Sequence, residues 1–163
     1  MTAETSPSNS ADLPHLPRRS AETSKRDYGR VVVVGGAAGM AGAPALAAMA
    51  ALRSGAGLVE MLVPDVVLTI AASFDPCVMS RGLPSHPDGT FAPAAAAEAW
   101  PRLAAADAVA IGPGMGRSDA VREFVRRVWH DLPVPTVFDA DALWAIATLG
   151  PDARAGHAGP RIL

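Results

Sequence analysis

Three short segments hold the residue types best suited to chemistry. They are residues 35–43 (GGAAGMAGA), 112–116 (GPGMG) and 139–141 (DAD), and each follows a short apolar run. Glycine lacks Cβ, so backbone amides in the first two segments can turn sharply and approach a bound phosphate or ring. The two carboxylates of the third could position a hydroxyl, a water molecule or magnesium. A structural interpretation stays open for all three, namely tight turns for the glycines and a helix cap or solvated loop for the aspartates.

Neither glycine segment matches a generic nucleotide motif. In residues 35–44 no lysine follows a glycine at P-loop spacing, and no glycines take the G-x-G-x-x-G spacing of the dinucleotide fingerprint. Gly114 and Gly116 have the first part of that spacing, but Asp119 stands at the third glycine position. A plain P-loop NTPase or Rossmann oxidoreductase is therefore disfavoured.

The first glycine segment lies inside one β-loop-α-turn-β unit. Residues 31–34 are four consecutive valines, which suits a strand buried on both faces. Pro44 is placed for the first turn of a helix, and residues 45–53 are good helix formers. Gly55 and Gly57 end that helix, and residues 58–63 return as a second strand, which the short crossover makes parallel to the first.

The remaining chain repeats this alternation. Ser118 is expected to cap an amphipathic helix whose inner face includes Phe124 and Trp129, and Pro101 is expected to kink or restart the helix that contains it. The expected helices are residues 66–72, 93–106, 119–129 and 143–149. The expected strands are residues 108–111, 135–138 and one beginning at 161. The expected loops are residues 79–91, at the surface or as a rim, and residues 150–160.

This element order predicts an α/β, three-layer αβα fold with a mainly parallel sheet. In such sheets ligands bind outside the carboxyl ends of the strands, where all three segments lie. If the strands are neighbours, the three segments converge.

Composition narrows the function classes. Half of the 163 residues are apolar, and 14 Lys and Arg against 16 Asp and Glu give a net charge of -2, so neither nucleic acid nor an anionic membrane is expected as a partner. Cys77 is the sole cysteine, which excludes an internal disulfide and predicts a small buried thiol in the cytoplasm. His86 is expected to be a surface loop residue rather than a metal ligand, and no metal site is predicted. Residues 1–28 are polar and are expected to form a flexible tail without the features of a secretory signal.

Three linked motifs resemble a known family. They are GGAAGMAGAPALAAMAALRSGAGLV (35–59), AVAIGPGMGRS (108–118) and PTVFDADAL (135–143). In this order and at these separations they look like the ADP- or ATP-dependent NAD(P)H-hydrate dehydratases of the ribokinase-like superfamily. The resemblance covers residues 25–163, and the domain is expected to occupy residues 29–163 as the N-terminal portion of a ribokinase-like domain.

The resemblance implies a lyase that repairs nicotinamide nucleotides. It implies dehydration of the S-epimer of NADH or NADPH hydrate, by phosphorylation of the hydroxyl and elimination of phosphate, with ADP or ATP as donor and Mg2+ as cofactor. It also implies a homo-oligomer working alongside an NAD(P)H-hydrate epimerase. Carried over motif by motif, the implied substrate-binding residues are Ala43, Gly114, Gly116 and Asp139, with further loop contacts from Gly36, Met40, Gly42, Gly112 and Asp141.

The chain also departs from the family pattern. The 163 residues contain neither a T-P-H-P-G-E segment nor the N-x-G-T-G-D segment that carries the family's catalytic aspartate, so no catalytic residue is assigned and the fold is expected to be incomplete at its C-terminal side. Ala37 and Trp144 stand where the family commonly has Ser and Asn. We expect part of the substrate site and no activity from the chain alone. Two alternatives stay open: a sugar or hydroxymethyl-pyrimidine kinase of the same superfamily, and a non-catalytic module.

Overall fold

The centre of the molecule is a six-stranded sheet in which every neighbouring pair is parallel. The computed structural model describes residues 18–163, apart from the side chains of residues 152 and 153. The strand order is β3-β2-β1-β4-β5-β6. The strands are β1 (Arg30–Val34), β2 (Leu58–Pro64), β3 (Met79–Leu83), β4 (Ala108–Ile111), β5 (Thr136–Phe138) and β6 (Arg161–Ile162). The predicted α/β class with a parallel sheet is confirmed.

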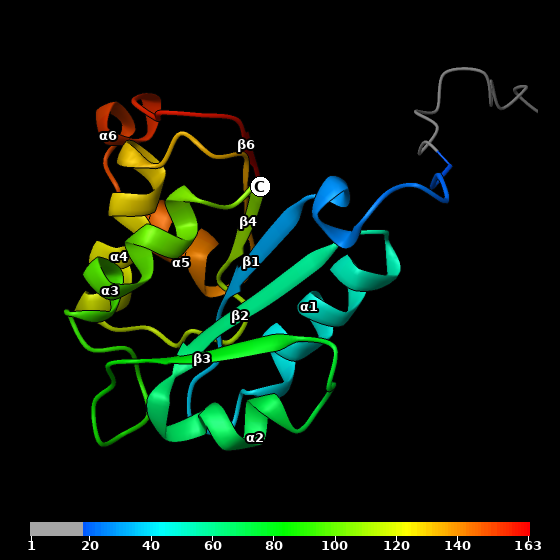
Figure 1. The fold of residues 1–163 in the computed structure, drawn as a ribbon. Helices are drawn as coiled ribbons and strands as arrows, with labels where there is room; N and C mark the ends of the chain where they lie inside the picture. The colour runs from blue at the N-terminus through cyan, green and yellow to red at the C-terminus, as the bar shows by residue number, and fades with distance from the viewer. Residues whose placement is uncertain (1–17) are drawn as a thin grey trace, which may run out of the picture.

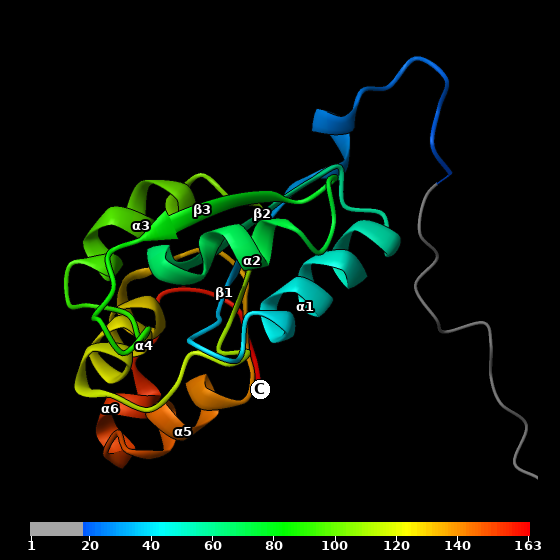
Figure 2. The ribbon, with the colours of Figure 1, turned by 90° about the horizontal axis from the view of Figure 1, so that it is seen from below.

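Helices flank both faces of this sheet and complete three layers. Figure 1 shows α1 and α2 on one side and α3 to α6 on the other, and Figure 2 shows the same division from below. The helices are α1 (Gly42–Arg53), α2 (Leu68–Ala72), α3 (Ala95–Ala104), α4 (Asp119–Asp131), α5 (Asp141–Ala147) and α6 (Pro151–Ala155), with 3-10 turns η2 (Lys25–Tyr28) and η3 (Asp65–Val67).

The valine run of β1 explains its central position. Val32 and Val34 face the core under α3, α4 and α5, whereas Val33 faces the core under α1 and α2. All three side chains are at most 1% exposed. A strand that is apolar on both faces is stable only between two covered surfaces, which is where β1 lies.

The order of the strands decides which face each helix covers. From β1 the chain moves to β2 and β3 on one side, then crosses back and continues through β4, β5 and β6 on the other. Because such crossovers are right-handed, reversing the direction moves the helices to the opposite face. The reversal lies between β1 and β4, and ligands of open α/β sheets bind at the carboxyl ends of such a strand pair.

Several local predictions are corrected. Residues 79–83 were predicted as part of a loop and form β3, an edge strand that pairs with β2. Its polar residues do not form the apolar pattern typical of a strand, because an edge strand needs less apolar surface than a central strand. Part of the predicted loop 150–160 forms α6. The helix α3 continues through Pro101 rather than restarting there. The carbonyl that Pro101 leaves without an amide partner belongs to Ala97, an exposed residue, so the lost bond costs less than it would in the core.

The prediction for Cys77 is wrong, because its thiol is exposed. The backbone amide of Cys77 donates to Asp75 Oδ1 at 2.7 Å, which forms a tight turn. This turn points Val78 into the core instead, where it is 8% exposed. Val78 is therefore the buried residue of this turn, whereas the sequence predicted that Cys77 would be buried.

The N-terminal expectation falls partly outside the described residues. Residues 1–17 of the predicted tail are not described, whereas residues 25–28 form η2, capped by Ser24 and Asp27. The amide of Gly57 donates to Tyr28 O at 3.0 Å, so η2 lies against the turn that follows α1. Within residues 18–163, no helix has both the length and the apolar character needed to cross a membrane.

Candidate functional site

The loops that follow β1 and β4 are joined through their backbones. Gly36 N donates to Pro113 O at 2.9 Å. A Cβ on Gly35 would lie 2.3 Å from the same oxygen, closer than any side chain permits. Glycine at position 35 is therefore required for the two loops to meet.

Gly114 brings the second loop against the start of α1. It has a φ of +64°, and a Cβ there would lie 2.9 Å from Met40 Cβ and 3.3 Å from Ala43 Cβ. Met40 is 40% exposed. The substrate-site candidates Met40, Ala43 and Gly114 are thus neighbours at the carboxyl edge of the sheet, as the sequence predicted.

The β5 loop joins the same group from the other side. A Cβ on Gly112 would lie 1.8 Å from Asp139 O, and φ at Gly112 is +127°, so this contact also depends on glycine. Asp139 is exposed, and its Oδ1 accepts from Ala140 N at 2.7 Å. Ala140 has a φ of 49°, the only positive value for a described residue other than glycine. Backbone strain of this kind accumulates at ligand sites, because the surrounding structure must hold it in place.

Asp141 has a positioning role toward the β4 loop. Its Oδ2 accepts from Gly116 N at 2.9 Å, and its Oδ1 accepts from Arg117 Nε at 3.2 Å. The carboxylate therefore holds the glycine loop and a guanidinium rather than pointing into open space. Trp144, the large residue that replaces a polar one, packs against the core and has the Arg117 guanidinium 5.7 Å from its ring centre.

The start of α1 has no side-chain cap and few free amides, because Ala43 N donates to Met40 O at 3.2 Å and Pro44 has no amide hydrogen. The N-cap residue of this helix is Ala41, and no described side chain forms a cap hydrogen bond there. Gly42 opens the helix, and a Cβ on it would meet only the tip of Phe74, at 3.7 Å. An uncapped helix start attracts anions through its amides and its dipole.

A fourth loop, between β3 and α3, reaches this edge; the sequence predicted it as a surface or rim loop but not its contact with the β1 loop. Ala38 N donates to Gly89 O at 3.1 Å, and Gly116 lies near Thr90. The Thr90 hydroxyl and amide both donate to Asp88 Oδ1, and these bonds lower the pKa of the Asp88 carboxyl. His86 is exposed on the same loop, as predicted. The contact between this loop and Ala38 depends on the strand β3, which positions the loop and which the sequence pattern did not indicate.

The structure therefore gathers all the candidate residues at the carboxyl ends of three adjacent strands. The β1 loop and the start of α1 carry Gly36, Met40, Gly42 and Ala43; the β4 loop carries Gly112, Gly114 and Gly116; the β5 loop carries Asp139 and Asp141. Within the described residues, no group of three or more His, Cys, Asp or Glu side chains could hold a metal ion. The arrangement offers amides and a carboxylate, not a metal centre of its own.

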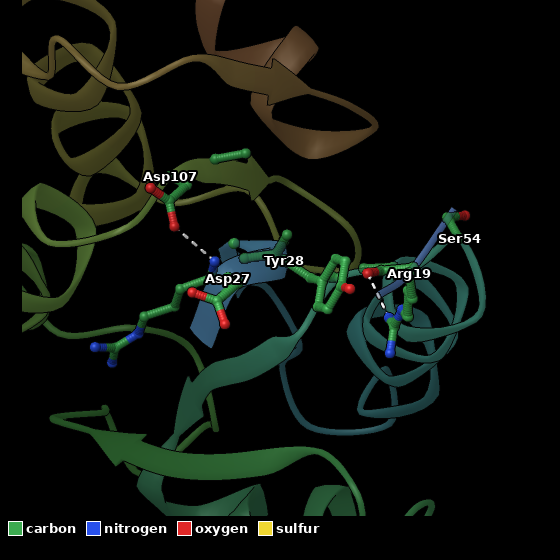
Figure 3. Close-up of a pocket in the computed structure, with 12 residues that line it drawn as sticks. Arg19, Asp27, Tyr28, Ser54 and Asp107 are labelled. Carbon is green, nitrogen blue, oxygen red and sulfur yellow. Dashed lines mark hydrogen bonds between the residues drawn. The ribbon is translucent and has the colours of Figure 1, made fainter. Parts of the chain in front are cut away.

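A cavity of about 590 Å³ lies at the opposite edge of the sheet. Figure 3 shows the side chains around it, with Arg19, Tyr28, Ser54 and Asp107 among those labelled. None of the candidate residues lines this cavity. Because ligands of parallel α/β sheets bind at the carboxyl ends of the strands, the loops are a better candidate site than this cavity.

The comparisons with known proteins agree on one family. The family model described as NAD(P)H-hydrate dehydratase matches residues 31–163. A bifunctional NAD(P)H-hydrate repair enzyme of Moorella thermoacetica is 45% identical over 150 residues, which are 91% of this chain and 28% of that protein. An ATP-dependent (S)-NAD(P)H-hydrate dehydratase of Bos taurus is 32% identical, and the match covers 81% of this chain and 39% of that protein.

Solved structures agree with this result. An ADP/ATP-dependent NAD(P)H-hydrate dehydratase of Bacillus subtilis, co-crystallised with ATP/Mg2+, has a TM-score of 0.65 and 28% identity, with 91% of this chain and 48% of that chain covered. A ribokinase-like protein of Enterococcus faecalis has a TM-score of 0.66 at 23% identity, which supports the fold alone. The chain thus spans less than half the length of these curated and solved relatives. On the match over residues 31–163, this chain belongs to the NAD(P)H-hydrate dehydratase family.

Proposed function

We propose that this chain provides the hydrate-binding wall of an ADP- or ATP-dependent dehydratase that restores NADH or NADPH from the S-epimer of its hydrate. The observation that carries the proposal is the interlocking of the β1, β4 and β5 loops at the strand reversal, in a chain of this family. Gly35, Gly112 and Gly114 bring these loops together because a Cβ at each of these positions would clash with the neighbouring loop. Such a surface can receive a ring and phosphates without side-chain obstruction.

The proposed reaction has two steps. The hydroxyl oxygen of the hydrate attacks the terminal phosphorus of the nucleotide and loses its proton to solvent. The bond from that phosphorus to the nucleotide breaks, and the nucleotide leaves one phosphate shorter. The C–O bond of the resulting ester then breaks, phosphate departs with the electron pair, and loss of a proton from the adjacent carbon restores the double bond. In this scheme Ala43, Gly114 and Gly116 hold the hydrated ring, and Asp139 accepts a hydrogen bond from its hydroxyl.

The nucleotide and its cation are part of the proposal. Mg2+ keeps several waters and is bound in most sites by one or two carboxylates together with substrate phosphates. Asp139 supplies one exposed carboxylate beside the loops, and the positive end of the α1 dipole, without a side-chain cap, favours an anionic group. These residues fit a cation that is bound chiefly by the nucleotide's phosphates.

The partners and the location of the reaction are also part of the proposal. The Moorella relative is named as a bifunctional repair enzyme, which supports an epimerase acting alongside the dehydratase. A homo-oligomer and a cytoplasmic location belong to the proposal as well, the latter because the chain has a single cysteine.

Binding of hydrated NADPH to the chain tests the proposal. Gly114→Val places a branched side chain against Met40 and Ala43 at a positive φ, and we expect it to weaken binding by about tenfold or more in calorimetry. Gly150→Val is the matched control, since nothing lies within 4 Å of its Cβ position and it is far from the loops. Equal affinities for the two variants, or no binding by the parent chain, would refute the hydrate-binding role.

A further inference from the structure

Fixed positive charge is scarce on the loops at the carboxyl edge of the sheet. Arg117 is the only Arg or Lys in the four loops that meet there, which are residues 35–41, 84–94, 112–118 and 139–140. A hydrated dinucleotide carries a negatively charged diphosphate, and the NADPH form carries a third phosphate. A guanidinium binds phosphate oxygens well, because its planar N–H groups match them in pairs. Arg117 is therefore the residue of these loops best suited to meet that charge.

The Arg117 side chain is held at one point and open at its end. Its Nε donates to Asp141 Oδ1 at 3.2 Å, and Asp141 Oδ2 accepts from Gly116 N at 2.9 Å. Among the described residues this is the only hydrogen bond of the Arg117 side chain, which is 64% exposed. A guanidinium has five N–H donors. The donors on Nη1 and Nη2 thus have no partner among those residues and can bind a phosphate.

An aromatic ring supports the same guanidinium. The Cζ atom of Arg117 lies 5.7 Å from the ring centre of Trp144, and that of Arg122 lies 5.6 Å from it. A guanidinium is attracted to an aromatic ring within roughly 6 Å of its centre. Arg122 is also paired with Asp119 of its own helix. Trp144 stands where the family commonly has Asn, which has no ring, so this support is absent from the common family pattern.

Arg117 lies beside the residues proposed to bind the hydrate. It follows Gly116 directly in the chain, and its side chain is directed toward the first turn of α5, because its Nε bonds to Asp141. The exposed carboxylate of Asp139 precedes that turn. Phosphate is attracted to the guanidinium and repelled by the carboxylate. A hydrate whose hydroxyl meets Asp139 is therefore best bound with its phosphates at Arg117.

We propose that Arg117 binds the diphosphate of the hydrated dinucleotide, and that Trp144 is a positioning residue that holds its guanidinium for this contact. This role of Arg117 rests on the proposed function, because it concerns the same site and the same substrate. It adds a charged group to a site otherwise formed by glycine loops, Ala43 and Asp139. ATP carries phosphates of the same chemistry, so the experiment needs a separate arm for it.

Titrations followed by 15N–1H NMR separate phosphate binding from ring binding. The ligands are hydrated NADPH, hydrated reduced nicotinamide riboside, which has no phosphate, and ATP. Arg117→Gln should weaken the binding of hydrated NADPH by about tenfold or more and leave that of the riboside within about twofold. Arg117→Lys should cause an intermediate loss of about threefold, because it keeps the charge without the planar fork. Arg126→Gln, on the exposed side of α4, is the matched control and should change neither affinity.

Substitutions of Trp144 test the support on Arg117. Trp144→Asn, which introduces the residue common in the family, should weaken the binding of hydrated NADPH by about fourfold, whereas Trp144→Phe, which keeps a ring, should stay within about twofold. In the presence of Arg117→Gln, Trp144→Asn should have no further effect, because its contribution passes through the guanidinium. Equal losses with and without Arg117 would show that Trp144 acts only through the core.

The outcomes distinguish a failure at Arg117 from a failure of the whole hydrate site. If the parent chain binds hydrated NADPH and Arg117→Gln binds it equally well, or loses the riboside to the same extent, Arg117 does not bind the diphosphate and the proposed function is untouched. If Arg117→Gln weakens the binding of ATP alone, the guanidinium serves the phosphate donor, which also overturns the assignment. If the parent chain binds neither hydrate, the hydrate-binding role fails and the role of Arg117 fails with it.

Discussion

Two rows of side chains cross the same four strands and meet different environments. On the α4 face the row contains Leu62, Val34, Ile111 and Phe138, and each is at most 1% exposed. On the α1 face the row contains Met61, Val33, Ala110 and Val137, and exposure rises to 40% at its end. Residue types are similar in both rows, so chain topology, not composition, decides which side chains are buried.

The largest expected effect contrasts two neighbours on β5. Phe138→Ala should lower the free energy of unfolding by about 3 to 5 kcal/mol, because Phe138 is buried and packs edge-on to Trp129. Val137→Ala, one residue away on the α1 face of the sheet, should change it by less than about 0.5 kcal/mol, because Val137 is 40% exposed. Urea denaturation of both variants measures the difference. Similar losses would mean that the two faces are covered equally.

The next largest expected loss of stability concerns the close contact between the β4 and β5 loops. Gly112→Ala should cost about 2 kcal/mol or more, because the new Cβ would meet Asp139 O at 1.8 Å and the residue has a φ of +127°. Gly150→Ala, without such contacts or a positive φ, should stay within about 0.5 kcal/mol of the parent. Thermal unfolding of the pair provides the measurement. A mild Gly112→Ala would show that the loops are not locked together.

A smaller effect separates the starts of the two main helices. Ser118 accepts from Val121 N at 3.2 Å and caps α4, so Ser118→Ala should cost about 1 kcal/mol. The start of α1 has no such cap among the described residues, so Ala41→Gly breaks no cap bond. Glycine is the better N-cap residue, and this gain offsets the loss of the buried Ala41 methyl group, to leave a net change of about 0.3 kcal/mol. Equal costs in urea denaturation would argue against an uncapped start of α1.

Much of the fold followed from local pattern. The valines of β1, Pro44 in the first turn of α1 and the Ser118 cap each specify their element through nearby residues alone. Met79–Leu83 did not, because its polar residues suit an edge strand that only pairing with β2 defines. The exposure of Cys77 depended on which neighbour the turn buried, which no local pattern states.

The candidate site, like the fold, was predicted only in part from the sequence. The position of the three loops at the carboxyl ends of strands predicted that they would converge if the strands were neighbours, and the contacts of Gly112 and Gly114 agree with this prediction. It did not predict that Asp141 would hold Gly116 and Arg117, nor that the β3 loop would reach Ala38. Both contacts join residues far apart in sequence, and they follow from strand order rather than from any motif.

The most direct test of the account is a 15N–1H NMR titration of the chain with hydrated NADPH, because glycine amides mark both edges of the sheet. Binding at the candidate site should shift the amides of Gly36, Gly114 and Gly116 and leave those of Gly55 and Gly57, beside the opposite edge, unchanged. Shifts confined to Gly55 and Gly57, or the absence of any shift, would contradict the assignment of the hydrate site to the carboxyl edge.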